Sequence, residues 1–168
     1  MPCGGVEIVA FDDTLAPYFR DINAAWIETM FRIEPHDAHV LDNPRAVIVD
    51  PGGAIMFARD GAGAVIGTGA LMQTRPGIFE LTKMGVRETA RGSGAGAALL
   101  EALLHRAAAM PVDMLYLLTS SACRTAIRLY ERAGFVHDAA IMATYGATYA
   151  RCDVAMRYPD ALLAARRG

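Results

Sequence analysis

Apolar residues recur along this chain at two spacings, one typical of helices and one typical of strands. Residues 14–31, 97–109 and 122–133 have apolar positions every three or four residues, which predicts helices with one buried side. Pro111 ends the second of these segments, because proline disfavours helical geometry in the residue before it. Gly134 is suited to cap the third segment, and Asp12 or Asp13 to cap the first.

Shorter apolar runs, bounded by turn residues, predict seven strands. They cover residues 6–11, 54–58, 64–73, 78–86, 112–119, 135–143 and 150–158. Asp60-Gly61 marks a hairpin between the second and third strands. We expect the loop that contains Gly146 to join the last two strands in the same way. The proline-containing residues 32–51 predict a short second helix inside an irregular connection.

The order of these elements predicts a mixed α/β fold of the α+β class, in a single domain that spans residues 1–168. The fourth and fifth strands flank the helix at 97–109 and form a central βαβ crossover with it. The continuous apolar run at 112–119 suits a parallel strand that is covered on both faces. We expect the alanine-rich tail after Pro159 to fray.

Composition and charge narrow the class of protein. The formal net charge is −2 and no basic run occurs beyond Arg166-Arg167, which argues against a nucleic-acid partner. Charged residues or prolines interrupt every apolar stretch well before the ~20 residues of a membrane span. The first ten residues lack the pattern of a signal peptide, so we expect a cytoplasmic protein. A homodimer through exposed strands is left open.

The most informative motif is Arg91-Gly92-Ser93-Gly94-Ala95-Gly96, which lies between a strand and a helix. Three glycines in five residues permit left-handed backbone angles and let backbone N–H groups approach a ligand closely. The helix N-terminus adds unpaired N–H donors and the positive end of the helix dipole, which together favour a phosphate group. The segment therefore predicts a phosphate-binding turn, with a purely structural strand-to-helix turn as the alternative.

The same glycines formally satisfy the dinucleotide fingerprint, as Gly92-x-Gly94-x-x-Ala97. In that motif the first glycine follows the strand directly, whereas residues 87–91 separate the two here. The acidic residue expected at the end of the next strand is also missing, since Asp113 stands at the beginning of that strand. An NAD(P)-binding oxidoreductase is therefore the less favoured alternative.

Two motifs together resemble the GCN5-related N-acetyltransferase (GNAT) superfamily. The first is Arg91-x-x-Gly94-x-Gly96, after a strand that ends at Val86, and the second is Leu129-Tyr130-x-x-x-Gly134-Phe135. The resemblance covers nearly the whole chain in element order. It implies the acyl-CoA N-acyltransferase fold, in which helices flank a central mixed, mostly antiparallel sheet. It also implies acetyl-CoA as co-substrate.

On this resemblance, the glycine turn binds the pyrophosphate of acetyl-CoA and the preceding strand pairs with its pantetheine arm. A backbone N–H of that strand would hold the oxyanion of the tetrahedral intermediate. Family members often place an asparagine after the next strand, and Ser121 could replace part of its contact here. The expected cofactor-binding residues are Met84, Gly85, Val86, Arg91, Gly92, Ser93, Gly94, Ala95, Gly96, Ala97 and Ser121.

Direct acetyl transfer to an amine needs a proton donor for the leaving thiolate and a base for the amine. Tyr130 is the expected acid, since a phenol matches the basicity of a thiolate, with a buried core tyrosine as the alternative. Glu80 is the first candidate base or water-mediated relay, because the resemblance favours this strand position. It stands six residues before Val86, and we expect the two to share a face. Glu34 and His36 are the second candidates.

We expect the acceptor pocket between residues 30–45 and 143–151, with Glu34, His36 and Arg151 as acceptor-binding residues. Carboxylates favour a cationic amine, whereas an arginine favours a carboxylate on the acceptor. The sequence thus indicates a small-molecule amine or amino acid, without separating it from a peptide N-terminus or an amine antibiotic. The four histidines share no ligand spacing, so no metal is expected. A non-catalytic acetyl-CoA-binding module is the remaining alternative.

Overall fold

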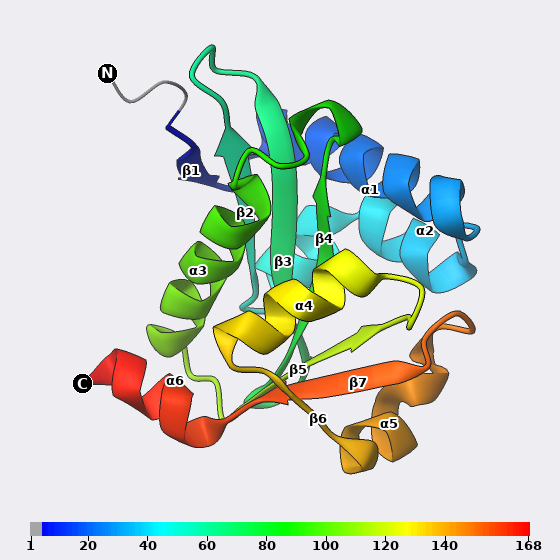
Figure 1. Cartoon of the computed structure of the whole chain (residues 1–168), viewed down its shortest axis with the longest axis vertical. Helices are drawn as coiled ribbons and strands as arrows, with labels where there is room; N and C mark the ends of the chain where they lie inside the picture. Colours follow the sequence, from blue (N-terminus) through cyan, green and yellow to red (C-terminus); the bar gives the residue numbers. More distant parts are fainter. Residues whose placement is uncertain (1–4) are drawn as a thin grey trace.

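The computed structural model describes residues 5–168, which are built around one seven-stranded sheet (Figure 1). The strand order is β1-β2-β3-β4-β5-β7-β6. Among the described pairs only β4 and β5 run parallel, so the expected mixed, mostly antiparallel sheet with a central βαβ crossover is confirmed. The strands are β1 (Glu7–Ala10), β2 (Ala54–Arg59), β3 (Val65–Arg75), β4 (Ile78–Val86), β5 (Met114–Thr119), β6 (Val136–His137) and β7 (Val154–Tyr158).

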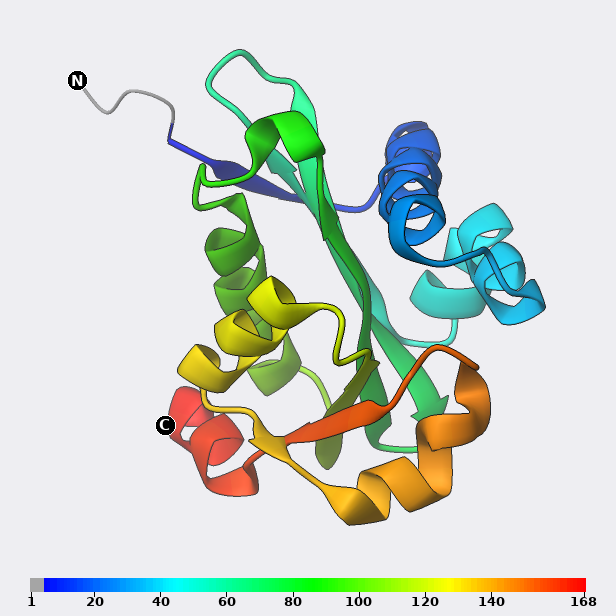
Figure 2. The same ribbon diagram turned by 45° about the vertical axis from the view of Figure 1, so that its right-hand side comes forward.

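Helices cover both faces of the sheet, as Figure 2 shows. On one face lie α1 (Ala16–Met30) and α2 (Pro35–Asp42); on the other lie α3 (Ala95–Ala108), α4 (Arg124–Ala133) and α6 (Asp160–Arg167). The remaining helix, α5 (Ala139–Tyr145), packs on β5 and β7. Short helical turns stand at Asp13–Leu15, Arg45–Val49, Glu88–Ala90 and Gly146–Thr148. None of the described helices is long and apolar enough to cross a membrane.

Local sequence signals account for several helix ends. The Asp12 carboxylate accepts a hydrogen bond from the Thr14 N–H at 2.8 Å and so begins the first helical segment. At the start of α2, the side chains of Glu34 and Asp37 cap each other's backbone N–H groups. Gly134 ends α4 with a left-handed φ of 110°. The expected helices are therefore confirmed, with ends shifted by only a few residues.

The strands β4 and β5 pair over only the first part of β4. Their register runs from Ile78↔Met114 to Leu81↔Leu117. Beyond that point β4 continues beside β3 alone, while β5 continues beside β7. The two strands diverge toward their carboxyl ends (Figure 1), so the second half of β4 has no strand partner on this side within the described residues. The candidate functional site described below lies in this gap.

A β-bulge at Lys83 changes the direction in which the end of β4 faces. Lys83 has a left-handed φ of 52°, and the register between β3 and β4 shifts at this point. The extra residue inverts the alternation of side chains beyond it. Leu81 and Val86 consequently both pack on the α3 side, whereas Glu80 faces the opposite side. The expectation that Glu80 and Val86 share a face was therefore wrong.

The end of the chain differs from the expected hairpin of strands at 135–143 and 150–158. The strand β6 has only two residues, and α5 occupies most of the first predicted strand. The Asp138 carboxylate accepts hydrogen bonds from the N–H groups of Ala140 and Ile141 and so caps a helix. The alanines that follow favour this helix. Its one buried side chain, Ile141, packs on β5 and β7 without the chain forming a strand.

The tail after Pro159 does not fray, contrary to the expectation. It forms α6, whose Leu163 is buried in the core. The Arg166 guanidinium pairs with the Glu101 carboxylate of α3 through two hydrogen bonds of 2.8 Å. Arg167 donates to the carbonyl of Ala108 at 2.9 Å, which satisfies an acceptor left free at the end of α3.

Candidate functional site

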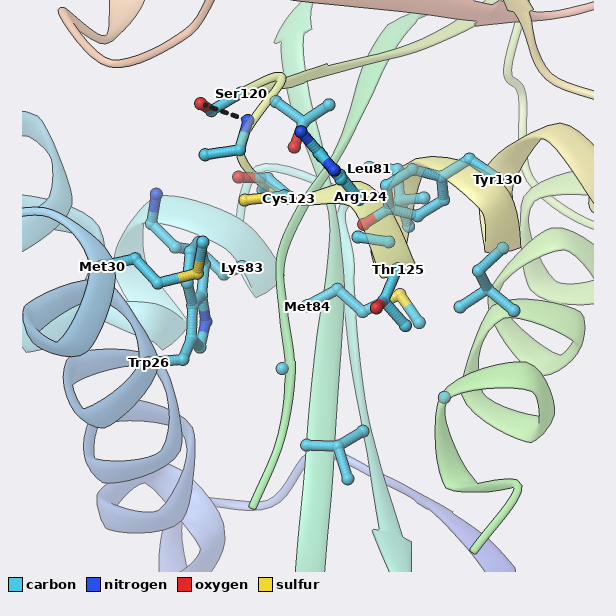
Figure 3. Close-up of a pocket in the computed structure, with 18 of the residues that line it drawn as sticks. Trp26, Met30, Leu81, Lys83, Met84, Ser120, Cys123, Arg124, Thr125 and Tyr130 are labelled. Carbon is cyan, nitrogen blue, oxygen red and sulfur yellow. Dashed lines mark hydrogen bonds between the residues drawn. The ribbon is translucent and has the colours of Figure 1, made fainter. Parts of the chain in front are cut away.

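A cavity of about 590 Å³ lies where β4 and β5 diverge (Figure 3). Its walls come from α1, the second half of β4, the glycine turn, α4 and the segment between α5 and β7. In Figure 3, Trp26 and Met30 of α1 stand on one side of β4, and Tyr130 of α4 stands on the other. The cavity therefore passes through the gap in the sheet from one helix-covered face to the other.

The glycine turn has the geometry of an anion-binding loop. Gly92 and Gly94 have φ angles of +81° and +87°, which L side chains rarely adopt. Gly94 is the N-cap of α3 and offers no side chain to the helix end, where Ser93 Oγ accepts a hydrogen bond from the Ala95 N–H at 3.3 Å. Within the described residues, the backbone N–H groups of Gly92, Gly94, Gly96 and Ala97 make no hydrogen bond. These free donors at a helix N-terminus fit a diphosphate.

The open edge of β4 forms another wall of the cavity, through Met84, Gly85 and Val86. A Cβ atom at Gly85 would lie 2.5 Å from Cδ1 of Trp26, so glycine is what lets α1 approach the strand this closely. An extended ligand with amide groups can pair with such an edge as an added strand does.

Tyr130 reaches the cavity from α4. Its side chain is only 9% exposed, and its ring meets Phe135 edge-on at a centroid separation of 5.9 Å. Burial, with a smaller effect from Cys123, raises the pKa of Tyr130 above its ordinary value. The phenol is therefore protonated at neutral pH and can act as a proton donor.

Three buried charges form a network on the α2 side of the cavity. The fully enclosed Asp37 carboxylate accepts a hydrogen bond from Lys83 Nζ at 2.8 Å and two from Arg151 at 2.7 and 2.9 Å. Lys83 Nζ also donates to the Tyr149 hydroxyl at 3.1 Å. Burial acts to raise the pKa of Asp37, but Arg151 and Lys83 hold it well below its usual range. Asp37 therefore stays ionised, as a buried carboxylate with two cationic partners should.

Glu80 lies behind this network and is 1% exposed. Burial raises the pKa of Glu80 to about 7, against the opposing effects of Lys83 and of a hydrogen bond with Thr82. The Thr82 side chain is also a hydrogen-bond neighbour of Tyr149. Thr82 and Tyr149 line the cavity, whereas Glu80 does not.

Glu34 connects residues 30–45 and 143–151, the two segments that were expected to enclose the acceptor. Its carboxylate accepts hydrogen bonds from the Ala150 N–H at 2.9 Å and from Arg151 at 3.1 Å. His36 packs beside Tyr149, with 5.3 Å between ring centroids, and burial lowers the pKa of its imidazole. A second cavity of about 510 Å³ adjoins this link and is lined by Phe31, Arg32, Glu34, Ala150 and Arg151.

The structure brings most of the predicted site residues to the first cavity. Those that line it are Met84, Gly85, Val86, Arg91, Gly92, Gly94, Ala95, Gly96, Tyr130 and Arg151. Those that do not line it are Ser93, Ala97, Glu34, His36, Glu80 and Ser121. Ser121 instead donates to the Asp153 carboxylate through its N–H and its hydroxyl, both at 2.7 Å.

Sequence reasoning missed Lys83 as a charged group of the site. Lys83 was not among the expected site residues, yet its ammonium group bonds to Asp37 and Tyr149 in the buried network. One signal was available, because Lys83 is the only lysine in the sequence and stands in a strand of largely apolar residues. The direction of its side chain depends on the bulge, which strand periodicity does not reveal.

A sheet that splits between two parallel strands, with an anion-binding turn at the split, defines the acyl-CoA N-acyltransferase class of fold. The family model described as Acetyltransferase (GNAT) family matches residues 11–135, more than half of the chain. The chain therefore belongs to the GNAT family of acetyltransferases, and the expected family and fold are confirmed. Among curated protein sequences, none matches it significantly.

Solved structures share this fold. A GNAT-family acetyltransferase from Staphylococcus aureus MU50 has a TM-score of 0.80 at 17% identity, over 91% of this chain and 98% of that one. Salmonella typhimurium YncA, solved with its cofactor acetyl-CoA, has a TM-score of 0.67 at 20% identity, over 80% and 82%. A phosphinothricin acetyltransferase from Sinorhizobium meliloti, in complex with acetyl-CoA, has a TM-score of 0.63 at 21% identity, over 79% and 76%.

Proposed function

We propose that this protein is an acetyl-CoA-dependent N-acetyltransferase that transfers acetyl directly to a primary amine of a small molecule or amino acid. The observation that carries the proposal is one cavity in which the glycine turn, the open edge of β4 and Tyr130 meet. These features match in turn the diphosphate, the amide-bearing arm and the thiol of acetyl-CoA. Two structures with the same fold contain that ligand, which supports the proposal.

The cofactor-binding part of the proposal rests on the backbone. The free N–H groups of the glycine turn would bind the diphosphate, with Arg91 adding positive charge at the cavity wall. Residues 84–86 would pair with the amides of the pantetheine arm. A backbone N–H of this edge would stabilise the oxyanion of the tetrahedral intermediate, a kind of contact whose loss costs ~10²–10³ in rate.

The chemical step needs two proton movements. The amine nitrogen bonds to the acetyl carbon, the carbon–sulfur bond breaks, and Tyr130 gives its phenolic proton to the departing thiolate. The amine proton passes to Glu80 by way of Tyr149 and Thr82, since the Glu80 carboxyl does not itself line the cavity. A carboxyl with a pKa of about 7 is suited to this role, because both of its protonation states are populated at neutral pH.

Thermal unfolding in the presence of acetyl-CoA, CoA, NAD or NADP tests the proposal. A ligand at ~100 times its Kd stabilises the folded state by roughly 2.7 kcal/mol, which raises the Tm by a few degrees in a domain of this size. We expect acetyl-CoA and CoA to raise the Tm and NAD and NADP to leave it unchanged. Thiol release from acetyl-CoA in the presence of primary amines then separates a transferase from a non-catalytic binding module. A shift with NAD or NADP alone would overturn the proposal.

A further inference from the structure

The charged side chains that line the larger cavity are all basic. Lys83, Arg91, Arg124 and Arg151 line it, and no carboxylate from the described residues does. Arg91 belongs to the glycine turn and Arg124 begins α4, so both come from the side that we assign to the cofactor. Lys83 and Arg151 come from the α2 side, where the acceptor would enter. The acceptor end of the cavity therefore presents positive charge.

The acidic partners of Lys83 and Arg151 are turned away from the cavity. The Asp37 oxygens accept from both cations and from the Glu34 N–H. The Glu34 oxygens accept from Ala150 and Arg151. These carboxylates therefore have few free acceptor positions, and Asp37 has no exposed surface.

Both cations, in contrast, keep unused donors. Lys83 Nζ makes two hydrogen bonds, and an ammonium group has three N–H donors. Arg151 makes three hydrogen bonds through Nη1 and Nη2, and its Nε donates to no group in the described part of the chain. Because both side chains line the cavity, their spare donors are available to a ligand there. Such donors fit an oxyanion.

Apolar surface surrounds this pair of cations. The Arg151 guanidinium carbon lies 4.7 Å from the ring centroid of Tyr149, 5.8 Å from that of Phe31 and 6.0 Å from that of Trp26. Met30 of α1 extends the same wall, as Figure 3 shows beside Trp26. A ligand that places an oxyanion on Arg151 and Lys83 would therefore place the rest of its body against aromatic and thioether groups.

We propose that the acceptor is a free amino acid with an apolar or aromatic side chain, whose carboxylate binds Lys83 and Arg151. This inference rests on the N-acetyltransferase function proposed above and names its substrate class. The new bond joins the α-amino nitrogen to the acetyl carbon, the thioester bond breaks, and the products are an N-acetyl amino acid and CoA. Two cations beside the amine also disfavour its ammonium form, which leaves the nitrogen lone pair free for attack.

Matched acceptors test this proposal on the unmodified protein. L-phenylalanine, L-phenylalaninamide and phenethylamine share one side chain, and only the first carries a carboxylate. Initial rates of CoA thiol release at saturating acetyl-CoA and pH 8, divided by the neutral fraction of each amine at that pH, give a comparable kcat/KM for each. L-methionine and L-methioninamide repeat the comparison with an aliphatic side chain. We expect each acid to exceed its amide by at least about tenfold, as for one charge-assisted contact.

Arg151→Lys locates the contact without removing the charge that Asp37 needs. We expect the KM for the amino acid to rise at least about fivefold, because lysine lacks the planar fork of donors that arginine offers a carboxylate. The KM for the amide and the Tm shift with acetyl-CoA should stay unchanged. Arg128→Lys, at an exposed position of α4 outside the cavity, is the matched control.

The outcomes separate this inference from the function on which it rests. If the amide or phenethylamine is acetylated with the same kcat/KM as the acid, the proposed carboxylate contact is wrong and the N-acetyltransferase function stands. If acetyl-CoA raises the Tm but no amine of either kind is acetylated, the proposed function fails and the substrate class fails with it. Equal effects of Arg151→Lys on the KM values of acid and amide would assign Arg151 a structural role only.

Discussion

The Tyr130 side chain is buried in the core, where Leu129 and Phe135 are among its apolar neighbours. A phenol in these surroundings loses its proton with difficulty, so it keeps the proton until a base such as a thiolate forms beside it. The Tyr149 hydroxyl also faces the cavity, but it already accepts a hydrogen bond from Lys83. The environments of the two tyrosines thus favour different roles, proton donor and proton relay.

Tyr130→Phe removes the hydroxyl and keeps the ring that packs against Phe135. We expect kcat to fall by roughly 10²-fold or more, the usual effect of losing a general acid. The Kd of acetyl-CoA, measured by calorimetry, should not change, because the ring and the glycine turn are intact. Tyr18→Phe, at an exposed site of α1 outside the cavity, is the control. An unchanged kcat in Tyr130→Phe would exclude Tyr130 as the acid.

At the scale of elements, the sequence predicts what local signals specify. Helix α3 is predictable from its glycine turn and its helical spacing of apolar residues. The short β6 and α5 are not, because Asp138 caps a helix within a segment whose apolar content resembles that of a strand. The bulge at Lys83 also escapes, since a register shift depends on the pairing with β3. That register shift places the side chains of Glu80 and Val86 on opposite faces of the sheet.

The same distinction applies to the candidate site. The glycine turn and Tyr130 are predictable because each belongs to a short motif within one or two elements. The buried network is not, because Asp37 is 46 residues from Lys83 and 114 from Arg151 in the sequence. Only the folded chain brings these charges together, so Arg151 was assigned to the acceptor without its partner Asp37.

Gly94→Ala tests the turn as an element. Alanine at a φ of +87° costs roughly 1–2 kcal/mol of backbone strain, and the substitution perturbs the free N–H groups beside it. We expect the Kd of acetyl-CoA to rise by at least about tenfold, or roughly 1.4 kcal/mol.

Gly63→Ala is the matched control for this variant. Gly63 has a φ of +84° in the β2–β3 turn, and a Cβ there, as at Gly94, would meet nothing within 4 Å. Both variants should lose similar stability in urea unfolding, and only Gly94→Ala should lose affinity for acetyl-CoA. Equal affinities in the two variants would contradict a role of the turn in cofactor binding.

At the scale of the whole molecule, Glu80 links stability to pH. Its carboxyl has an ordinary pKa of 4.5 and a pKa of about 7 when folded. Between these values the folded state holds a proton that the unfolded state releases, so stability falls as the pH rises through this window. The loss at pH 8 is at most about 3.5 kcal/mol, since one pKa unit corresponds to ~1.4 kcal/mol.

Glu80→Gln should remove this dependence. We expect the variant to gain stability relative to the wild type between pH 5 and pH 8, as measured by urea unfolding at both values. Glu28→Gln, at an exposed position of α1, should show no such gain. The same variant also tests the proposed relay, because its activity should lose the rise near pH 7 that ionisation of Glu80 produces. A parallel pH dependence of stability in wild type and variant would show that Glu80 ionises normally in the fold.

The position of the gap between β4 and β5 also disfavours strand addition between two molecules of this protein. A free strand edge normally acts as a template on which another molecule adds a strand, and such additions lead to aggregation. Here the free edge of β4 lies inside the molecule, with α1 on one side and α4 on the other (Figure 3). A slender extended ligand fits this slot, whereas a strand that belongs to another folded sheet cannot enter it. The fold thus offers unpaired backbone groups to a small molecule and withholds them from other proteins.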